Sequence, residues 1–334
     1  MEFLEMVTEK TLLPDKDSLL IEKIKEQLIE VFFSKMSWWK EEYRTDKPDF
    51  FRIDLARHSY MRYNVCIKNI IPWIDEVFPL RDKDMVEIGC GTGSSGTAFS
   101  TICSQVWGYD IDLKSIDAAK KRKEVMEIDN VDFTHAWPSK IQALVMENHA
   151  PESLDIVLFY AVLEHQTVAE RIESLQNAWT LLKPGGILVV VETPNRLTFE
   201  DWHTSQIDFF LLLPLELQLL YYNRSPRNNF VSNIDFHAQQ KSQSKLLDLL
   251  TRWGQGVSYH EFELVFGNLE KIVLNDGYHP MMRKLRPIKH DETLLQSYII
   301  AKGLKVPIGF TRQSIDVILR KTKRCSNRAL IELG

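Results

Sequence analysis

The segment Met85–Gly93 constrains the fold of this chain most strongly, because a short apolar strand runs directly into closely spaced glycines. A run of small residues follows, and about twenty residues later a second apolar stretch ends in Asp110. Glycines let the backbone approach a ligand without side-chain clash, and an acid at the end of the second strand accepts hydrogen bonds from ribose hydroxyls. The segment therefore predicts a βαβ unit that holds an adenosine-containing cofactor.

The glycine loop fits two patterns. Gly91–Gly96 matches the dinucleotide pattern G-x-G-x-x-G, whereas Glu87–Gly93 matches E-x-G-x-G-x-G. In the dinucleotide fold, the loop opens a helix whose N-terminus faces a pyrophosphate. A carboxylate at Glu87 would repel a pyrophosphate, but it can help to hold the cationic methionine end of S-adenosylmethionine. The position of Glu87 favours the second pattern, and a nicotinamide-dependent oxidoreductase is the alternative from another class.

Further blocks follow in a fixed order. Leu154–Tyr160 is typical of a buried strand, a helical segment ends in Lys183–Gly186, and another apolar strand covers Ile187–Glu192. With the glycine loop, these blocks resemble the class I S-adenosylmethionine-dependent methyltransferases, especially the branch that includes the quinone-biosynthesis O-methyltransferases. The resemblance covers about 84–195, with an end of the domain near Lys302. It implies S-adenosylmethionine as cofactor and S-adenosylhomocysteine as product, and it leaves the acceptor unspecified.

Composition agrees with an ordinary enzyme. The chain has 334 residues and a formal net charge of −5, which gives no global attraction to nucleic acid. Its four cysteines are far apart and form no C-x-x-C pair, so neither a disulfide framework nor a zinc site is indicated. The acidic start does not resemble a signal peptide, and no apolar run has the length of a membrane span. We expect a cytoplasmic enzyme without a nucleic-acid partner, and composition leaves the oligomeric state open.

Alternation of strands and helices predicts a Rossmann-like α/β fold with a mostly parallel seven-stranded sheet flanked by helices. The first five strands are predicted at 84–88, 105–110, 131–135, 154–160 and 187–192. The family resemblance adds a sixth strand near Val257–Phe266 and an antiparallel seventh near Ser297–Ala301. Apolar residues at helical spacing predict helices over Leu19–Met36 and Tyr60–Phe78, the second broken at Pro72.

These elements divide the chain into three expected parts. A helical cap covers 1–80, and the methyltransferase domain covers 81–303. An insertion at about 196–240 is expected to form a lid over the acceptor. The remainder, 304–334, is a basic C-terminal extension that could dock an acidic glycan, a phospholipid surface or nucleic acid, although a solvated helix is the simpler interpretation.

The layout assigns roles at the cofactor, each beside a structural alternative. The glycines form the loop, Asp110 accepts from the ribose diol, Ile111 packs on the adenine, and Asp112 caps the next helix. The family usually places an acid followed by a small residue after strand three, but this chain has His135–Trp137, so backbone groups there would replace the acid. Tyr160 lines the sulfonium cleft or is a simple core aromatic. The residues assigned to the cofactor are Glu87, Gly89, Cys90, Gly91, Gly93, Asp110, Ile111, Ala136, Trp137 and Tyr160.

Candidate catalytic residues follow the fourth strand. The related quinone methyltransferases have Glu-x-x-Glu-His here, which can bind a divalent metal, but Ala161 replaces the first acid. Glu164 and His165 alone are a thin ligand set, so no metal is expected. His165 is instead a candidate general base, or it only orients the next helix. His203 is a second acid/base candidate, and Arg196 could contact an anionic or polyhydroxylated acceptor.

Substrate specificity is expected to reside after the fifth strand. The apolar stretch Ile207–Tyr222 could form a buried lid, a dimer contact or a surface that rests on a membrane. We expect O-methylation of a small-molecule, sugar or glycan-linked hydroxyl. Methylation of a quinone or lipid at a membrane surface is the alternative, favoured if Ile207–Tyr222 is exposed. A non-catalytic cofactor-binding subunit is the remaining interpretation.

Overall fold

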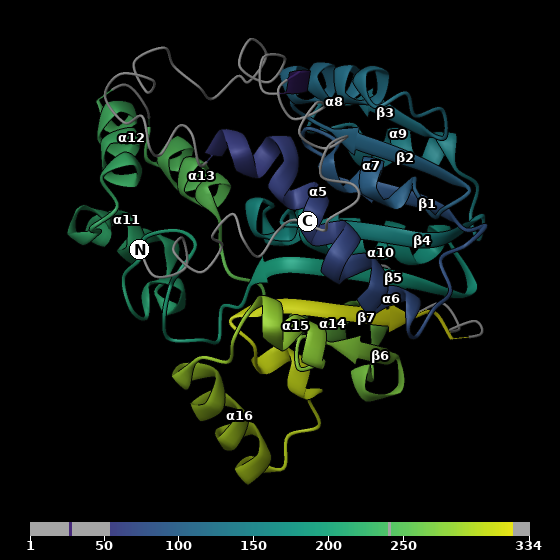
Figure 1. Cartoon of the computed structure of the whole chain (residues 1–334). Helices are drawn as coiled ribbons and strands as arrows, with labels where there is room; N and C mark the ends of the chain where they lie inside the picture. Colours follow the sequence, from purple (N-terminus) through teal and green to yellow (C-terminus); the bar gives the residue numbers. More distant parts are fainter. Residues whose placement is uncertain (1–26, 29–53, 240–241, 323–334) are drawn as a thin grey trace. The chain divides into compact units, whose positions relative to one another are not determined.

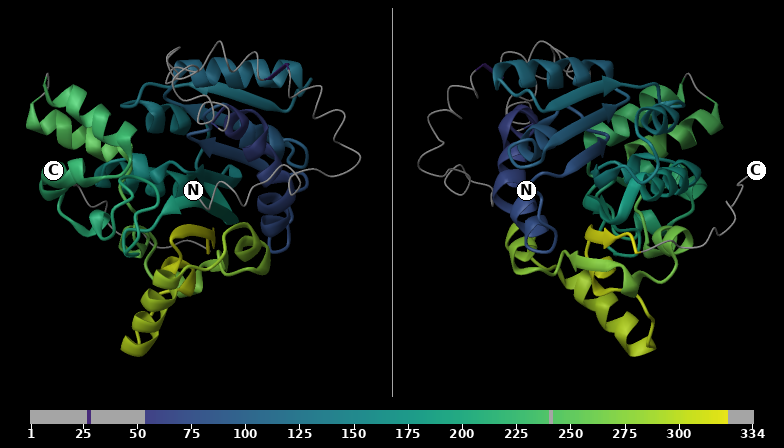
Figure 2. Two further views of the ribbon diagram at one scale, coloured as in Figure 1. Left: turned by 60° about the vertical axis from the view of Figure 1, so that its left-hand side comes forward. Right: turned by 90° about the vertical axis from the view of Figure 1, so that its right-hand side faces the viewer.

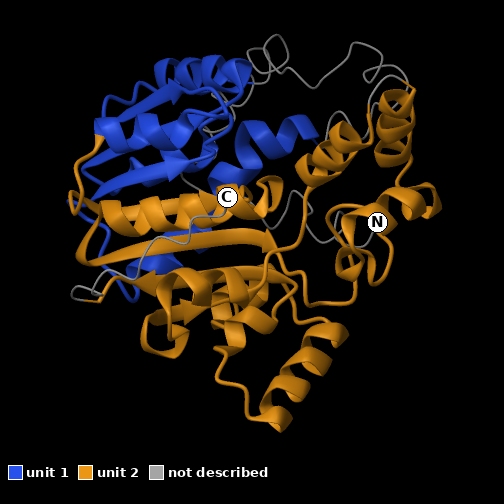
Figure 3. Ribbon diagram, turned by 180° about the vertical axis from the view of Figure 1, so that it is seen from behind, with its two compact units in different colours: residues 1–148 blue, residues 149–334 orange. Residues whose placement is uncertain are grey.

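The computed structural model describes residues 27–28, 54–239 and 242–322 (Figure 1). Its strands form a seven-stranded sheet of order β3-β2-β1-β4-β5-β7-β6. The pairs β1–β2, β2–β3 and β4–β5 are parallel, whereas β7 runs antiparallel to β5 and β6. The chain divides into two compact units, residues 1–148 and 149–334 (Figure 3). This is the mostly parallel Rossmann-like sheet that the sequence predicted.

Unit 1 contains the glycine loop and three parallel strands. Their register aligns Ile88 with Tyr109 and Asp110 with His135, so the carboxyl ends of these strands meet at one edge. The strand positions confirm the sequence predictions. The elements of this unit after residue 80 are β1 (Asp84–Ile88), α7 (Ser94–Phe99), β2 (Gln105–Asp110), α8 (Leu113–Val125), β3 (Val131–His135) and α9 (Ile141–Asn148).

The helical segment before β1 is continuous, and the break predicted at Pro72 was wrong. A proline inside a regular α-helix clashes with the carbonyl four residues earlier. Here the turn before it widens into a π-helix, which moves that carbonyl away. The segment comprises η2 (Arg57–Met61), α5 (Arg62–Val65), η3 (Cys66–Ile70) and α6 (Ile71–Asp75). Apart from residues 27–28, the helix predicted over Leu19–Met36 lies outside the described residues.

Unit 2 contains the other four strands and the helices that follow them (Figure 2). Its strands are β4 (Leu154–Tyr160), β5 (Leu182–Pro194), β6 (Val273–Asp276) and β7 (Ser314–Arg320). Its α-helices are α10 (Val168–Leu181), α11 (Leu215–Tyr221), α12 (Asn228–Ala238), α13 (Gln243–Trp253), α14 (Tyr259–Phe266), α15 (Pro280–Leu285) and α16 (His290–Lys302). Its 3-10 turns are η4 (Leu163–His165), η5 (Phe210–Leu212), η6 (Tyr222–Arg224), η7 (Leu269–Lys271) and η8 (Ile308–Thr311).

The predicted positions of the last two strands were wrong. Val257–Phe266 is mostly helix α14, which begins with a capping box between Ser258 and Glu261. Ser297–Ala301 lies inside helix α16. The sixth strand follows at Val273–Asp276, and the seventh lies within the range that we assigned to a C-terminal extension. Short apolar runs do not distinguish strand from helix, which explains both errors.

The insertion after β5 has a small core of its own. Phe210, Leu211, Phe230, Ile234 and Leu250 are buried together. The apolar stretch Ile207–Tyr222 therefore contributes to packing, but it also leaves Leu217, Leu220 and Tyr221 exposed. Among the described helices, none is both long and apolar enough to cross a bilayer.

Candidate functional site

The glycine loop after β1 adopts backbone conformations that favour glycine. Gly89, Gly91 and Gly93 have φ angles of +79°, +52° and +74°. A Cβ on Gly93 would lie 2.6 Å from Phe133 Cζ, whereas a Cβ on Gly91 would meet nothing within 4 Å. The turn is therefore fixed at Gly93 by packing, and the space at Gly91 is open to a ligand. These features fit the cradle that the predicted cofactor needs.

Asp110 connects this loop to the end of β2. Its Oδ2 accepts a hydrogen bond from Gly91 N at 2.7 Å, and its Oδ1 accepts from Asp112 N at 2.8 Å. Burial raises the pKa of this carboxyl above its ordinary value. Each carboxylate oxygen has a further lone pair that a ribose hydroxyl could use. The role of Asp110 toward the ribose therefore stays a prediction. The N-cap prediction for Asp112 is confirmed, because its side chain accepts from Lys114 N and Ser115 N.

Glu87 is completely buried at the end of β1. Its Oε1 accepts a hydrogen bond from the Ser95 hydroxyl. Burial penalises the charged form and raises its pKa to about 7. A carboxylate in this position gains from a cationic ligand, which agrees with a role toward the methionine amine of S-adenosylmethionine.

Glu87 should also make stability depend on pH. Its pKa is about 7 in the folded protein against an ordinary 4.5, so the folded state holds the proton more tightly than the unfolded chain. The stabilising contribution is complete below the lower value and is lost as pH rises through the upper one. A difference between these two pKa values corresponds to roughly 3 kcal/mol of stability. The free energy of unfolding, measured with urea, should therefore decline between pH 5 and 8, and Glu87→Gln should remove this part of the decline. If the free energies of the wild type and the variant fall in parallel over this range, the assignment is wrong.

The other residues assigned to the cofactor have contrasting environments. Ile111 and Trp137 are exposed, and Ala136 is buried. His135 Nε2 lies 3.2 Å from the Ile111 carbonyl oxygen, and its ring meets that of Trp137 edge-on at 5.3 Å. Tyr160 is buried at the end of β4, in unit 2. The roles of these residues stay predictions.

Arg122 supports the glycine loop, and the sequence analysis did not single it out. Its side chain is buried in unit 1. Its Nε donates to the Thr92 carbonyl at 3.0 Å, and its Nη2 donates to the His58 carbonyl and to Ser94 Oγ at 2.6 and 2.9 Å. Burial lowers its pKa to about 9. A buried arginine on α8 that binds both the glycine loop and the His58 carbonyl of η2 holds the loop in place.

A second group of titratable side chains lies in unit 2, after β4. Glu164 and His165 come from η4, and His203 comes from the segment after β5. His165 Nε2 is 3.7 Å from Glu164 Oε1, and His203 Nε2 is 4.0 Å from the same oxygen. The two imidazole rings have centroids 5.4 Å apart. The structure thus brings together the two histidines that the sequence proposed separately; we call these three residues the Glu164 cluster.

Hydrogen bonds define the tautomers of both imidazoles. His165 Nδ1 lies 2.9 Å from the Arg252 carbonyl oxygen, which can only accept, so Nδ1 donates. Thr204 Oγ1 donates to the Gly254 carbonyl and therefore accepts from His203 Nδ1 at 3.2 Å. Both Nε2 atoms are then left to face a carboxylate oxygen. In this arrangement the Nε2 atoms, and not the Nδ1 atoms, are the ring nitrogens that can accept a proton.

The same atoms could also hold a cation. One ligand atom from each of the three side chains lies within 4.8 Å of the others. The sequence suggested only Glu164 and His165 as metal-ligating groups, and His203 is a third. Imidazoles whose Nδ1–H is fixed by an oxygen acceptor, as here, are typical metal ligands.

Neighbouring residues hold the cluster in place. Gln255 N donates to the Glu164 carbonyl at 2.7 Å. Arg171 is buried and donates to the carbonyls of Leu163 and Gln255 at 2.7 and 3.0 Å. Gly254, with φ +125°, allows the His203 ring to approach, because a Cβ there would lie 2.6 Å from it. The sequence analysis missed these supports, although an arginine on the apolar side of helix 169–182 was a visible signal.

Arg196 follows β5, and its main chain is tied to the segment before α14. Its backbone N donates to the Val257 carbonyl at 2.9 Å, and its side chain is half-buried. A separate ionic group lies at the end of β5. Arg286 contacts Glu192 and Asp316 at 3.1 and 3.0 Å, and Glu192 has a left-handed φ of +59°. This group fixes the backbone where β5 leaves the sheet.

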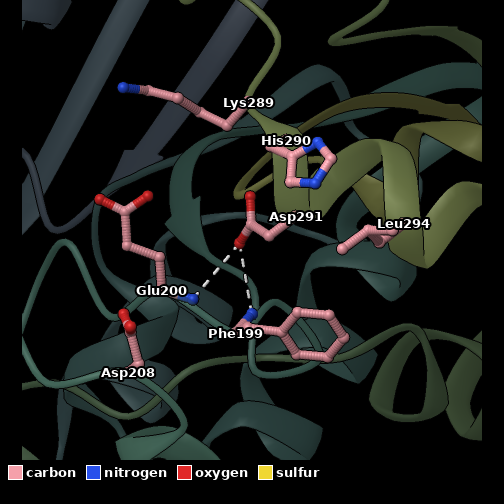
Figure 4. Close-up of a pocket in the computed structure, with 7 residues that line it drawn as sticks. All are labelled: Phe199, Glu200, Asp208, Lys289, His290, Asp291 and Leu294. Atoms are coloured by element: carbon pink, nitrogen blue, oxygen red, sulfur yellow. Dashed lines mark hydrogen bonds between the residues drawn. The ribbon is translucent and has the colours of Figure 1, made fainter.

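A hollow of about 460 Å³ lies between the segment after β5 and the start of α16 (Figure 4). Asp291 Oδ2 accepts from the backbone N atoms of Phe199 and Glu200 at 3.2 and 3.3 Å, as the dashed lines show. The Lys289 side chain extends away from this carboxylate. Asp291 therefore ties the segment after β5 to the first turn of α16.

Comparison with known proteins agrees with the cofactor site. Residues 86–190 match the family model of the methyltransferase domain. With the fold and the glycine loop, this match confirms the resemblance to class I S-adenosylmethionine-dependent methyltransferases. Relatives named as quinone-biosynthesis O-methyltransferases, the branch that the sequence resembles, are among the similar proteins.

The chain spans only about half of the length of the curated relatives that it matches. The chain is 33% identical over 128 residues to the ubiquinone biosynthesis O-methyltransferase of Stutzerimonas stutzeri, covering 38% of this chain and 50% of that protein. It is 32% identical to the Rhodopseudomonas palustris enzyme of that name, covering 49% and 60%. The tRNA 5-carboxymethoxyuridine methyltransferase of Escherichia coli is 32% identical over 105 residues, covering 31% and 38%. The solved phosphoethanolamine N-methyltransferase 1 of Haemonchus contortus aligns with a TM-score of 0.35 at 20% identity, covering 55% and 35%.

Proposed function

We propose that this chain transfers a methyl group from S-adenosylmethionine to an acceptor hydroxyl, and that the Glu164 cluster takes the acceptor's proton. The observation that supports the proposal is the convergence of two imidazole Nε2 atoms on one buried carboxylate. With one proton in the cluster, one imidazole can accept another. Glu164 then stabilises the imidazolium that forms.

Each unit has a separate task in this proposal. The glycine loop and Asp110 bind the adenosine, and Glu87 faces the methionine amine. Bound S-adenosylmethionine supplies a methyl group that its sulfonium already activates. The protein therefore needs only to align the acceptor oxygen and remove its proton.

A small-molecule or glycan-linked hydroxyl is our first choice of acceptor. The exposure of Leu217, Leu220 and Tyr221 favours the alternative of a quinone or lipid acceptor at a membrane surface. The relative named as a tRNA methyltransferase makes RNA a further acceptor class to test, against the expectation from net charge.

The class of cofactor is tested by calorimetric titration with S-adenosylhomocysteine, with NADH as control. We expect Asp110→Ala to weaken S-adenosylhomocysteine binding by about tenfold or more, because it removes a charged acceptor of ribose hydrogen bonds. Asp132→Ala is the matched control, since Asp132 is an exposed acid on β3 paired with Lys123. Unchanged affinity in Asp110→Ala would contradict the ribose assignment. Binding of NADH without binding of S-adenosylhomocysteine would favour the alternative of a nicotinamide-dependent oxidoreductase.

The acceptor class is tested with labelled methyl donor. Phenolic quinone precursors, hydroxylated sugars and bulk tRNA are offered separately, before and after treatment with a chelator. Label in a small hydroxylated acceptor that is insensitive to the chelator supports the proposal. If the chelator abolishes activity and Zn²⁺ or Mn²⁺ restores it, the Glu164 cluster binds a metal ion instead. If label appears in tRNA alone, the acceptor is RNA and not a small hydroxylated molecule.

A further inference from the structure

Helix α16 has an exposed apolar face. Leu294, Tyr298 and Ile300 are 47%, 58% and 64% exposed, and Leu304, just after the helix, is 45% exposed. In the two views of Figure 2, α16 stands clear of the other labelled helices of unit 2. Apolar side chains gathered on a surface commonly mark an interaction site.

The helical geometry separates two faces. The buried side of α16 holds Asp291, Glu292, Leu295 and Ile299. At about 100° per residue, the opposite side holds Leu294, Ile300 and Ala301 with the hydroxyls of Thr293 and Ser297, and exposed Tyr298 lies at its edge. The middle of this solvent-facing side carries no charged residue, whereas an ordinary surface helix exposes many.

Cations flank this face at both ends. The carboxylates within 281–308 are Asp291 and Glu292, and both are buried. Exposed basic residues lie before the helix and at its end; they are Arg283, Lys284, Lys289, Lys302 and Lys305. Within this segment, apolar side chains therefore lie between two groups of positive charge, and both of its own carboxylates are buried. The exposed Glu200 and Asp208, from the segment after β5, line the hollow beside Lys289 and Leu294.

We propose that this face, residues 283–305, docks onto an anionic phospholipid surface. The apolar side chains would enter the boundary between headgroups and acyl chains, and the flanking cations would contact the phosphates. A two-fold contact with a second copy is disfavoured, because pairing two α16 helices places cationic ends against cationic ends. RNA would use the cations but would gain nothing from Leu294 and Ile300. The inference is independent of the acceptor and of the chemistry at the Glu164 cluster.

The test uses the full chain and sedimentation with vesicles. We expect binding to vesicles containing phosphatidylglycerol, little binding to pure phosphatidylcholine, and weakening by salt. Ile300→Glu and the double variant Lys302→Glu/Lys305→Glu should each lower partitioning by about tenfold or more. Leu264→Glu on α14 is the matched control, because Leu264 is 49% exposed, close to the value for Leu294, and lies outside this face. S-adenosylhomocysteine binding should be equal in all variants, which verifies that they are folded.

Three results would overturn the proposal. The first is that the wild-type chain fails to bind the anionic vesicles, or binds them no less well after Ile300→Glu than after Leu264→Glu. The second is tRNA binding that depends on Lys302 and Lys305 together with absent vesicle binding. The third is a dimer in lipid-free solution that Ile300→Glu dissociates. Because these readouts involve no methyl transfer, they distinguish failure of this proposal from failure of the proposed activity.

Discussion

Replacing His203 by asparagine is expected to lower turnover by about two orders of magnitude or more, with affinity for S-adenosylhomocysteine unchanged. The imidazole Nε2 faces Glu164 at 4.0 Å and is a candidate to accept the acceptor's proton. Asparagine retains a polar group but cannot take up a proton near neutral pH. Single-turnover rates with labelled methyl donor measure the effect, and the variant should lose the acidic limb of the pH–rate profile that histidine imposes.

Matched variants separate proton transfer from structure in this experiment. His260→Asn removes an exposed histidine on α14 and should retain the wild-type rate. His165→Asn should also lower turnover, and the double variant should lose less than the product of the two single effects, since both rings act on one carboxylate. If His203→Asn and His165→Asn both keep wild-type turnover, alignment of the acceptor alone accounts for the rate and the base assignment is wrong.

The sequence predicted the first five strands because each is a short, mainly apolar stretch bounded by glycine or polar residues, continuous as in 187–191 or alternating as in 131–135. The loop geometry was equally readable, since three glycines with positive φ can be recognised from their spacing. The last two strands were misplaced because their true positions lie beyond inserted helices, and β6 has only four residues. For Val273–Asp276, no local pattern separates a partly buried edge strand from a loop.

The sequence proposed His165 and His203 one by one, but it could not predict that they meet. Helix α10, strand β5 and the segment after β5 separate the two histidines in the sequence. Tertiary packing therefore determines that their rings meet. Gly254 is a further case, because its φ of +125° and the ring against it depend on a segment distant in sequence. Arg171 could have been found, since a charged residue on the apolar side of a helix predicts a buried ion pair.

Arg171→Met is expected to lower the free energy of unfolding by about 3–5 kcal/mol. The guanidinium is buried and donates to the carbonyls of Leu163, Gln166, Gln255 and Gly256 and to Glu261 at 3.0 Å. Methionine fills the space but leaves these acceptors without donors, and each unsatisfied buried group costs about 1–3 kcal/mol. Urea unfolding followed by far-ultraviolet circular dichroism measures the loss.

Arg252→Met is the control for this change. Arg252 pairs with Glu170 at 2.6 Å, but its side chain is 41% exposed, so we expect a loss below about 1 kcal/mol. Arg171→Met/Glu261→Leu should recover part of the stability, because it also removes the carboxylate left unpaired. Since Arg171 fixes the turn that holds Glu164 and His165, the single variant should lose turnover even where it remains folded. Full turnover with a loss of several kcal/mol would mean that Arg171 stabilises unit 2 without positioning the Glu164 cluster.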